Sequence, residues 1–528
     1  PPARNPGIDG LINTPDDILA SPGVIRSDEL NAFIGDDVFG FNPQITGRSA
    51  PTMINAAFGN DLFWDGRARS QFVDPQTGNV AIPVGGGLES QIVQPPVSDV
   101  EMAHQDRDWQ QIAQKLRRSR PLDLSTNIPP DVAAELTGDP GYPELFTRAF
   151  GDPGINSRRI AFAIATYERT LISDQTPFDA FRAGVPNAMT PQQVQGFNAF
   201  QTSNCSVCHA IAQDLFTGQG FRNIGLRPPT EDIGRQIVTG DPADRGKFKV
   251  PTLRNVGLKR SFMHNGQFQN LGQVIGFYAR APGAAPQFAD NQDPVMATVN
   301  VPPPAAQVII DFLSNALTDP RVAAETFPFD RPTMFMQRPG DRPTLVGGGR
   351  PGTGGVLPVM IVDAPGLIGS FDHRVGVRDA LAGAPATLVF SLTEPTGADV
   401  AMDEVVGQMD IDGDGLATMQ WPLVPGQFAD GDVLFAQWRI DDPAATDGVA
   451  LSAIARIPVF CGSSGCAPEC LGDVNGDRTV NLQDLSAFLG SFGKTGDASW
   501  IDGDFDGDKD VDLADLAAIL SVFGAICG

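Results

Sequence analysis

The sequence predicts a multidomain protein in which mainly helical domains precede an all-β sandwich and a small helical module. Three observations lead to this prediction. Apolar residues recur at helical spacing in residues 156–172, as Ile160, Ile164, Tyr167 and Leu171. Short apolar runs separated by Gly, Asp and Pro fill residues 356–460, which is typical of packed antiparallel strands. The C-terminal segment contains a duplication with a 31-residue period.

The length of 528 residues is too great for one ordinary hydrophobic core. We expect an N-terminal helical domain in residues 1–172 and a second helical domain in residues 173–337. A Pro/Gly-rich linker is expected in residues 338–355, because these residue types interrupt regular structure. The β-sandwich should then occupy residues 356–460, and a disulfide-stapled module residues 461–528.

Composition excludes some partners and indicates a compartment. The chain has 63 acidic and 37 basic residues, so it lacks the positive charge that a nucleic-acid partner requires. No apolar run is long enough to predict a transmembrane segment. Cys461, Cys466, Cys470 and Cys527 predict two disulfides, which form in oxidising compartments. Because the sequence begins at Pro1 without Met or a signal peptide, we expect a processed or trimmed, exported protein of the periplasm, cell surface or extracellular space.

The most specific motif of the chain is Cys-Ser-Val-Cys-His, formed by residues 205–209. At this spacing Cys205 and Cys208 can bond the two vinyl groups of one haem, and His209 then faces the iron. The alternative is a zinc half-site or a disulfide beside an incidental histidine. No second cysteine or histidine pair follows at zinc spacing. The sequence therefore predicts one covalent haem c in this chain.

The C-terminal duplication predicts two calcium sites, because oxygen-bearing side chains on alternate loop residues suit this cation. The predicted ligands are Asp473, Asn475, Asp477, Thr479, Asn481 and Asp484 in the first loop, and Asp504, Asp506, Asp508, Asp510, Asp512 and Asp515 in the second. A short apolar helix should follow each loop. The unit resembles a type I dockerin, which implies a cohesin-like or self-assembly partner. Arg478 and Lys509 stand where an EF-hand loop has Gly, and an acidic solvated tail is the alternative interpretation.

Several segments around the haem motif occur in a familiar order. They are RSAPTMINAAF (48–58), FWDGR (63–67), residues 91–102, TPFD (176–179), FKVPTLRN (248–255) and MHNG (263–266). Together they resemble the bacterial dihaem cytochrome c peroxidase and MauG family over about residues 45–320. The resemblance implies two c-type haem domains, one haem that reacts with hydrogen peroxide, and a second haem that relays electrons. The motif at Cys205 matches the second haem.

The resemblance also implies roles for individual residues. Trp64 matches the tryptophan between the two haems. Gln91, Pro95 and Glu101 match the distal pocket of the peroxidatic haem, where the carboxylate moves a proton between the peroxide oxygens.

The position 14 residues after His264 of the MHNG motif holds a Met ligand in the electron-transfer peroxidases and a Tyr in MauG. In this chain it is Tyr278, which favours a MauG-like iron ligand. Met263 is the alternative ligand, and His264 is counted with the cofactor-binding residues. A third interpretation is that Tyr278 is simply a buried, hydrogen-bonded tyrosine.

The sequence departs from the family at the first haem. Residues 1–63 contain neither Cys nor His, although the family has a haem motif a few tens of residues before the position of Trp64. The motif could lie upstream, which we favour, or on a companion chain, or it could have been lost. Ser49 stands where many family members have a calcium-binding Asn, so that site is not expected here.

The sequence thus leaves two functions open. The first is a secreted haem protein that reduces hydrogen peroxide, or oxidises a substrate through its haem and Trp64, with a redox protein as partner. The second is a non-enzymatic, monohaem electron-transfer or cell-surface assembly protein that uses the calcium module. Whether the chain is an enzyme is not decided by the sequence.

Overall fold

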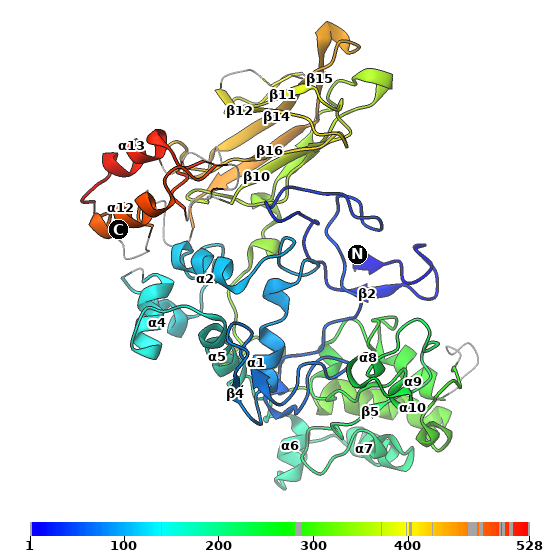
Figure 1. Cartoon of the computed structure of the whole chain (residues 1–528). Coiled ribbons are helices and arrows are strands. Elements are labelled where there is room, and N and C mark those ends of the chain that lie inside the picture. Colours follow the sequence, from blue (N-terminus) through cyan, green and yellow to red (C-terminus); the bar gives the residue numbers. More distant parts are fainter. Residues whose placement is uncertain are drawn as a thin grey trace. The chain divides into compact units, whose positions relative to one another are not determined.

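A computed structural model describes the fold (Figure 1). It describes residues 3–138, 140–279, 287–370, 372–397, 399–400, 404–424, 426–462, 472–474, 479–495, 498, 502–505 and 510–525. Internal contacts divide the chain into two compact units. Unit 1 comprises Pro1–Ile25, Asp37–Ala103 and Asn156–Asp330, and unit 2 comprises Arg26–Asp36, His104–Ile155 and Arg331–Gly528. The predicted multidomain organisation, with a helical part and a strand-rich C-terminal part, is confirmed.

Unit 1 is mainly helical with long connections, and its strands form two-stranded ribbons. The helices are α1 (Gly87–Ile92), α5 (Ser157–Glu168), α6 (Pro177–Arg182), α7 (Pro191–Thr202), α8 (Gln236–Thr239), α9 (Leu271–Ala279), α10 (Pro303–Asp311) and α11 (Pro320–Ala323). The paired strands are β1 (Ala3–Asn5) with β2 (Ile18–Ala20), β3 (Phe72–Val73) with β4 (Val80–Ile82), and β5 (Phe221–Arg222) with β6 (Phe248–Lys249).

The largest apolar core of unit 1 lies where α7, α9 and α10 pack together. Phe200 of α7 contacts Phe216 and Phe312 with ring centroids 6.0 and 5.9 Å apart. Ile275 and Phe277 of α9 are buried in the same cluster. Cys205, directly after α7, packs against this cluster, so the core positions the start of the segment 205–209.

Helix α5 confirms the helix predicted from the apolar spacing. Asn156 caps its first turn by accepting a hydrogen bond from the Arg159 amide. Ile160 is buried as expected, whereas Ile164 is 41% exposed and Tyr167 is 50% exposed. The packed side instead carries small residues, because α5 lies close against α1. The apolar spacing therefore predicted the helix correctly, although Ile164 and Tyr167 lie on its half-exposed side.

The described residues of unit 2 form helices α2–α4, two sheets, and the C-terminal helices α12 and α13. The helices are α2 (Trp109–Arg118), α3 (Pro130–Glu135), α4 (Tyr142–Phe150), α12 (Leu482–Ser491) and α13 (Leu513–Ser521). One sheet has the order β13 (Ala417–Gln420), β10 (Arg374–Arg378), β8 (Val359–Ile361). The larger sheet has the order β12 (Glu404–Asp410), β11 (Pro385–Ser391), β14 (Val433–Asp441), β16 (Ile454–Phe460), β7 (Thr344–Val346), with β15 (Val449–Leu451) beside β14 and β9 (Gly366–Leu367) beside β16.

The two sheets of unit 2 share one buried cluster. Val375 and Val377 of β10 belong to the same cluster as Leu388 of β11 and Trp438 of β14, which face each other across the β11–β14 ladder. Strand β7 lies within the predicted linker and pairs with β16. The C-terminal region is therefore rich in β-sheet, while the finer assignment as a sandwich stays a prediction.

Two further observations concern sequence expectations. The free cysteines of the described part are Cys205 and Cys208. Cys466, Cys470 and Cys527 lie outside the described residues, so the two disulfides stay a prediction. Within the described part of the chain, no helix is long and apolar enough to cross a membrane.

Candidate functional site

The haem motif lies directly after α7, in a tight turn. Asn204 has a φ of 61° and redirects the chain, and a single turn of 3₁₀-helix then spans Cys205–Val207. The His209 amide donates to the Cys205 carbonyl at 3.0 Å, which closes the turn around both cysteines. A Cβ atom on Gly218 would lie 2.9 Å from the Cys208 carbonyl oxygen, so a larger residue would push residues 217–219 away from the motif.

The imidazole of His209 is oriented by backbone oxygen. Its Nδ1 atom lies 3.0 Å from the Phe216 carbonyl oxygen, so Nδ1 donates there in the tautomer whose Nε2 is free for a metal. Burial lowers the pKa of His209. Hydrogen bonds to the backbone of Phe216 and Pro251 oppose this shift, because they favour the protonated ring. His209 also lines a cavity, which leaves it available to bind iron.

Tyr278 of α9 lies close to both motif cysteines. Burial, with smaller contributions from Cys205 and Cys208, strongly raises the pKa of its phenol. The hydroxyl makes no hydrogen bond with a residue that the structure describes, while the ring contacts Phe277 edge-on. A half-buried phenol without a protein partner, beside the attachment cysteines, fits the predicted iron ligand. Met263 lines the same cavity, as does His264.

The cavity between these residues has a volume of about 1470 Å³. Ordinary small-molecule pockets measure about 300–1,000 Å³, so the space accepts a macrocycle. Its wall near the motif is formed by apolar side chains of α9, α10 and the segment after α10, including Leu271, Ile275, Ile309 and Leu313. Burial also raises the pKa of the Cys205 thiol to about 11, so this side chain is uncharged near neutral pH, as a thioether would be. The donor set and the shape of this site therefore fit a c-type haem.

Trp64 lies on the wall of the same cavity and is held at both ends. Its Nε1 donates to the Ser49 carbonyl at 2.7 Å, and its ring meets that of His264 edge-on at a centroid distance of 6.3 Å. His264 in turn stacks on Phe248 at 3.7 Å, and burial lowers its pKa to about 4. The indole is thus fixed beside a neutral imidazole.

An ion-pair network lies next to Trp64. Arg48 contacts Asp65 at 2.6 Å and Asp232 at 2.7 Å, and Arg67 contacts Asp65 at 3.1 Å. Burial opposes ionisation of Asp65, yet Arg48 and Arg67 outweigh it and hold the pKa of this carboxyl below its ordinary value. The ion pairs link Arg48, which precedes Trp64, and Asp65, which follows it, to Asp232. They therefore connect three segments that line the cavity beside Trp64.

Gln91, Pro95 and Glu101 line the same cavity as the haem motif. Gln91 belongs to α1, and Pro95 begins a short 3₁₀-helix, Pro95–Val97. The Glu101 amide donates to the Ser98 carbonyl at 3.1 Å, which turns the chain after that helix. The structure thus brings the three residues predicted for the distal pocket to one cavity wall.

Sequence reasoning missed Glu168, which also lines the cavity. The residue is 8% exposed, and its Oε2 atom is buried without a hydrogen-bond partner. The pKa of this carboxyl is raised to about 7, mainly by burial, with Arg169 opposing the shift and Glu89 adding to it. Arg169 itself contacts Glu89 at 2.7 Å. The sequence did contain a signal for this residue. Glu168 follows the apolar Ile160 by eight residues, a spacing that places both on the same side of a helix.

Substitution of Glu168 by Gln is expected to change how stability depends on pH. The folded-state pKa lies above the ordinary 4.5, so the stabilisation by the protonated acid is present below pH 4.5 and is lost as the pH rises through about 7. The free energy of unfolding of the parent should fall, relative to the variant, by at most about 3 kcal/mol across this range. Denaturant titrations at pH 4.5 and 8 measure it, with exposed Glu144→Gln as control. Parallel profiles for parent and Glu168→Gln would contradict the prediction.

The predicted calcium loops are described only in part. Asn475, Asp477, Asp506 and Asp508 lie outside the described residues, as do Arg478 and Lys509. In the second loop, carboxylate oxygens of Asp510, Asp512 and Asp515 lie within 4.8 Å of one another. Helices α12 and α13 begin after Asn481 and Asp512, each capped by the carboxylate three residues later. Asp473, Thr479 and Asp504 are described, and Asp504 is buried.

Comparison with known proteins adds a family. Residues 27–187 match the family described as di-haem cytochrome c peroxidase. The chain is 30% identical over 239 residues to cytochrome c peroxidase Ccp of Escherichia coli, covering 44% of this chain and 42% of that protein. It is 31% identical over 236 residues to the methylamine utilization protein MauG of Methylophilus methylotrophus, covering 44% and 57%. Cytochrome c551 peroxidase of Pseudomonas aeruginosa is 30% identical over 243 residues, covering 44% and 58%. The chain thus spans about half the length of these relatives.

Proposed function

We propose that this chain, which carries a di-haem cytochrome c peroxidase region over residues 27–187, is an exported c-type haem protein that reduces hydrogen peroxide or oxidises a substrate. The observation that carries the proposal is the cavity shared by Cys205, Cys208, His209 and Tyr278. Cys205 and Cys208 would hold the haem through thioethers, and His209 and Tyr278 would supply donor atoms to its iron. A haem bound there supplies one-electron chemistry and, with a phenolate ligand, favours the ferric state.

The other cavity residues have separate tasks in this proposal. Trp64, held by Ser49 and His264, would pass electrons or oxidising equivalents along the cavity wall. Gln91 and Pro95 would shape the peroxide pocket, and Glu101 would take a proton from one peroxide oxygen and return it to the other. The electrons come from a redox partner protein. Because residues 1–63 lack Cys and His, this turnover is expected where another segment or chain supplies the peroxidatic haem.

The first test is the number of covalent haems per natively purified assembly, measured by pyridine haemochrome and intact mass. Two haems would support peroxide turnover. One haem would favour the second candidate, a monohaem electron-transfer protein. That candidate has an observation of its own, because Tyr278 beside the cysteines would close the second axial position of this haem.

Glu101→Gln should lower peroxide turnover at least 100-fold at unchanged haem content, because general acid–base catalysis contributes about 10²–10⁴-fold. Turnover is measured by stopped-flow spectroscopy with a reduced donor protein. Exposed Glu144→Gln, which alters an ion pair of α4, is the control. Turnover that survives in Glu101→Gln would refute the acid–base role.

Residues 461–528 are proposed to form a dockerin-like calcium module that attaches the chain to a cohesin-like or self-assembly partner. The clustered carboxylates of Asp510, Asp512 and Asp515, at the start of α13, support it. Calorimetric titration should find two calcium ions per chain, and Asp515→Asn should reduce this to one, because a carboxylate at the loop end supplies ligands that an amide replaces poorly. Asp412→Asn, in the turn after β12, is the control. Equal stoichiometry in the parent and Asp515→Asn would contradict the second loop.

A further inference from the structure

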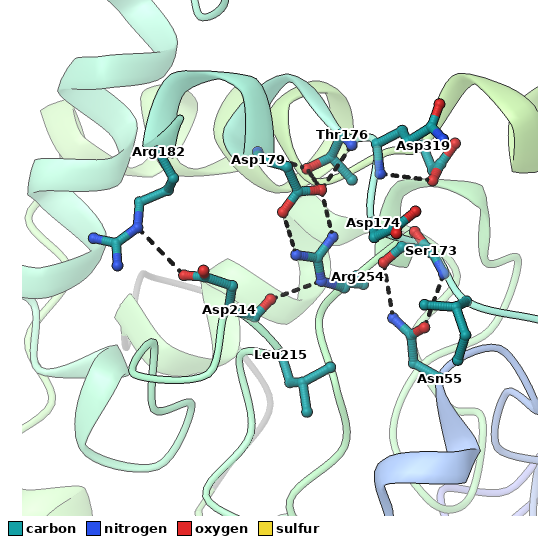
Figure 2. A network of polar contacts seen from close by, with 12 residues as sticks. Asn55, Ser173, Asp174, Thr176, Asp179, Arg182, Asp214, Leu215, Arg254 and Asp319 are labelled. Atoms are coloured by element: carbon teal, nitrogen blue, oxygen red, sulfur yellow. Dashed lines mark hydrogen bonds and ion pairs between the residues drawn. The ribbon is translucent and has the colours of Figure 1, made fainter. Parts of the chain in front are cut away.

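Three consecutive backbone carbonyls after the haem motif each accept a hydrogen bond from a different side chain. The Asp214 oxygen accepts from Arg254 Nε at 2.6 Å, and the Leu215 oxygen accepts from Thr252 Oγ1 at 2.6 Å. The Phe216 oxygen is the one that faces His209 Nδ1 at 3.0 Å. Residues 214–216 are called the carbonyl strap below. Figure 2 shows Arg254 between the strap and α6.

The backbone of the strap is held in an unfavourable conformation. Asp214 has a φ of 54°, which aspartate tolerates, and Phe216 has a φ of 53°, in the left-handed region that a bulky residue rarely adopts. Such a conformation persists only where surrounding contacts impose it. The Phe216 ring is fully buried and packs against Phe178 at 5.0 Å. The direction of the Phe216 carbonyl is therefore determined by tertiary contacts and not by local preference.

Arg254 connects the strap to α6, because it bonds both the Asp214 carbonyl and the Asp179 carboxylate. It is 6% exposed and forms a two-pronged contact with Asp179, with Nη1 donating to Oδ2 at 2.8 Å. Burial opposes ionisation of Asp179, but the hydrogen bonds from Arg254 and Thr176 outweigh it and lower the pKa of the carboxyl. Asp179 also closes the capping box of α6 with Thr176. Arg254 thus ties the strap to a helix terminus (Figure 2).

We propose that Arg254 and Thr252 are positioning residues that hold the Phe216 carbonyl against His209 and thereby set the reduction potential of the haem. The inference rests on the haem attachment proposed above. A carbonyl acceptor on Nδ1 makes the imidazole a stronger donor to iron, which stabilises the ferric state. Loss of either anchor lets the strap relax, weakens that hydrogen bond and raises the potential.

The experiment measures the midpoint potential of the haem in the full chain by spectroelectrochemistry, with covalent haem content determined beside it. Arg254→Gln and Thr252→Val should both raise the potential at full haem content. At the potential where the parent is half reduced, the ferrous-to-ferric ratio should rise about threefold to tenfold, and tenfold equals about 59 mV for one electron. Thr252→Ser, which keeps the hydroxyl, should restore the parent value.

Arg182→Gln is the matched control. Arg182 contacts the Asp214 side chain at 3.4 Å and leaves the three strap carbonyls bonded, so its potential should equal that of the parent. If Arg254→Gln does not fold, Thr252→Val and Thr252→Ser decide the question. An unchanged potential in Thr252→Val at full haem content overturns the positioning role and leaves the haem attachment intact. A parent chain without covalent haem overturns both.

Discussion

Replacement of both Cys205 and Cys208 by Ala is expected to abolish covalent haem attachment. The two thiols lie in one 3₁₀ turn that closes on His209, on the wall of a cavity large enough for the macrocycle. Without thioethers only the axial ligands would hold a haem, and denaturation would release it. Intact mass under denaturing conditions should show one haem per parent chain and none in the double variant. Ser206→Ala, between the two cysteines, is the control and should retain the haem.

The same experiment separates the motif from its alternatives. If Cys205 and Cys208 bound zinc, the parent would carry metal without the haem absorption, and the double variant would lose zinc. If they formed only a disulfide, the parent would carry neither group. Either result would remove the basis of the proposed redox function, whatever the activity of the wider assembly.

Replacement of Tyr278 by Phe is expected to change the optical spectrum of the ferric haem and to raise its midpoint potential. The phenol lies beside both attachment cysteines, and no described residue accepts its hydrogen bond. As an iron ligand it would be deprotonated, and an anionic oxygen donor favours ferric iron over ferrous iron. Phenylalanine fills the same space and supplies no ligand, so the iron should become high-spin. Electron paramagnetic resonance and spectroelectrochemistry measure both changes.

Two further variants make this test decisive. Tyr167→Phe, on the half-exposed face of α5, is the control and should leave the spectrum unchanged. Met263→Leu addresses the alternative ligand, because Met263 lines the same cavity. If the spectrum changes in Met263→Leu and not in Tyr278→Phe, the methionine is the ligand. If neither variant changes it, the haem has no ligand from this pair.

The helix α5 illustrates how far periodicity reaches. Four apolar residues at helical spacing predicted a helix, and the helix is present from Ser157 to Glu168. Ala161 and Ala165 of α5 are buried against α1, while Ile164 and Tyr167 stay half-exposed. Spacing reports local backbone geometry. Which side of a helix is buried depends on the element that packs against it, and the spacing of apolar residues carries no information about that element.

The sequence by itself determined the chemistry that depends on short-range covalent geometry. Two cysteines three positions apart, followed by histidine, have the spacing that bonds one haem, and residues 27–187 match the di-haem cytochrome c peroxidase family. The helical and strand-rich regions also follow from local patterning.

Only the tertiary structure decided what surrounds that motif. It placed Tyr278 of α9 beside Cys205 and Cys208, buried Glu168 in the cavity wall, and aligned the carbonyls of residues 214–216 with Arg254 and His209. The physical reason is that burial and hydrogen-bond direction are set by contacts between residues far apart in the chain. No local sequence pattern specifies that the Phe216 carbonyl accepts a hydrogen bond from His209 Nδ1. In the inference above, the electron-donating strength of the imidazole depends on that hydrogen bond.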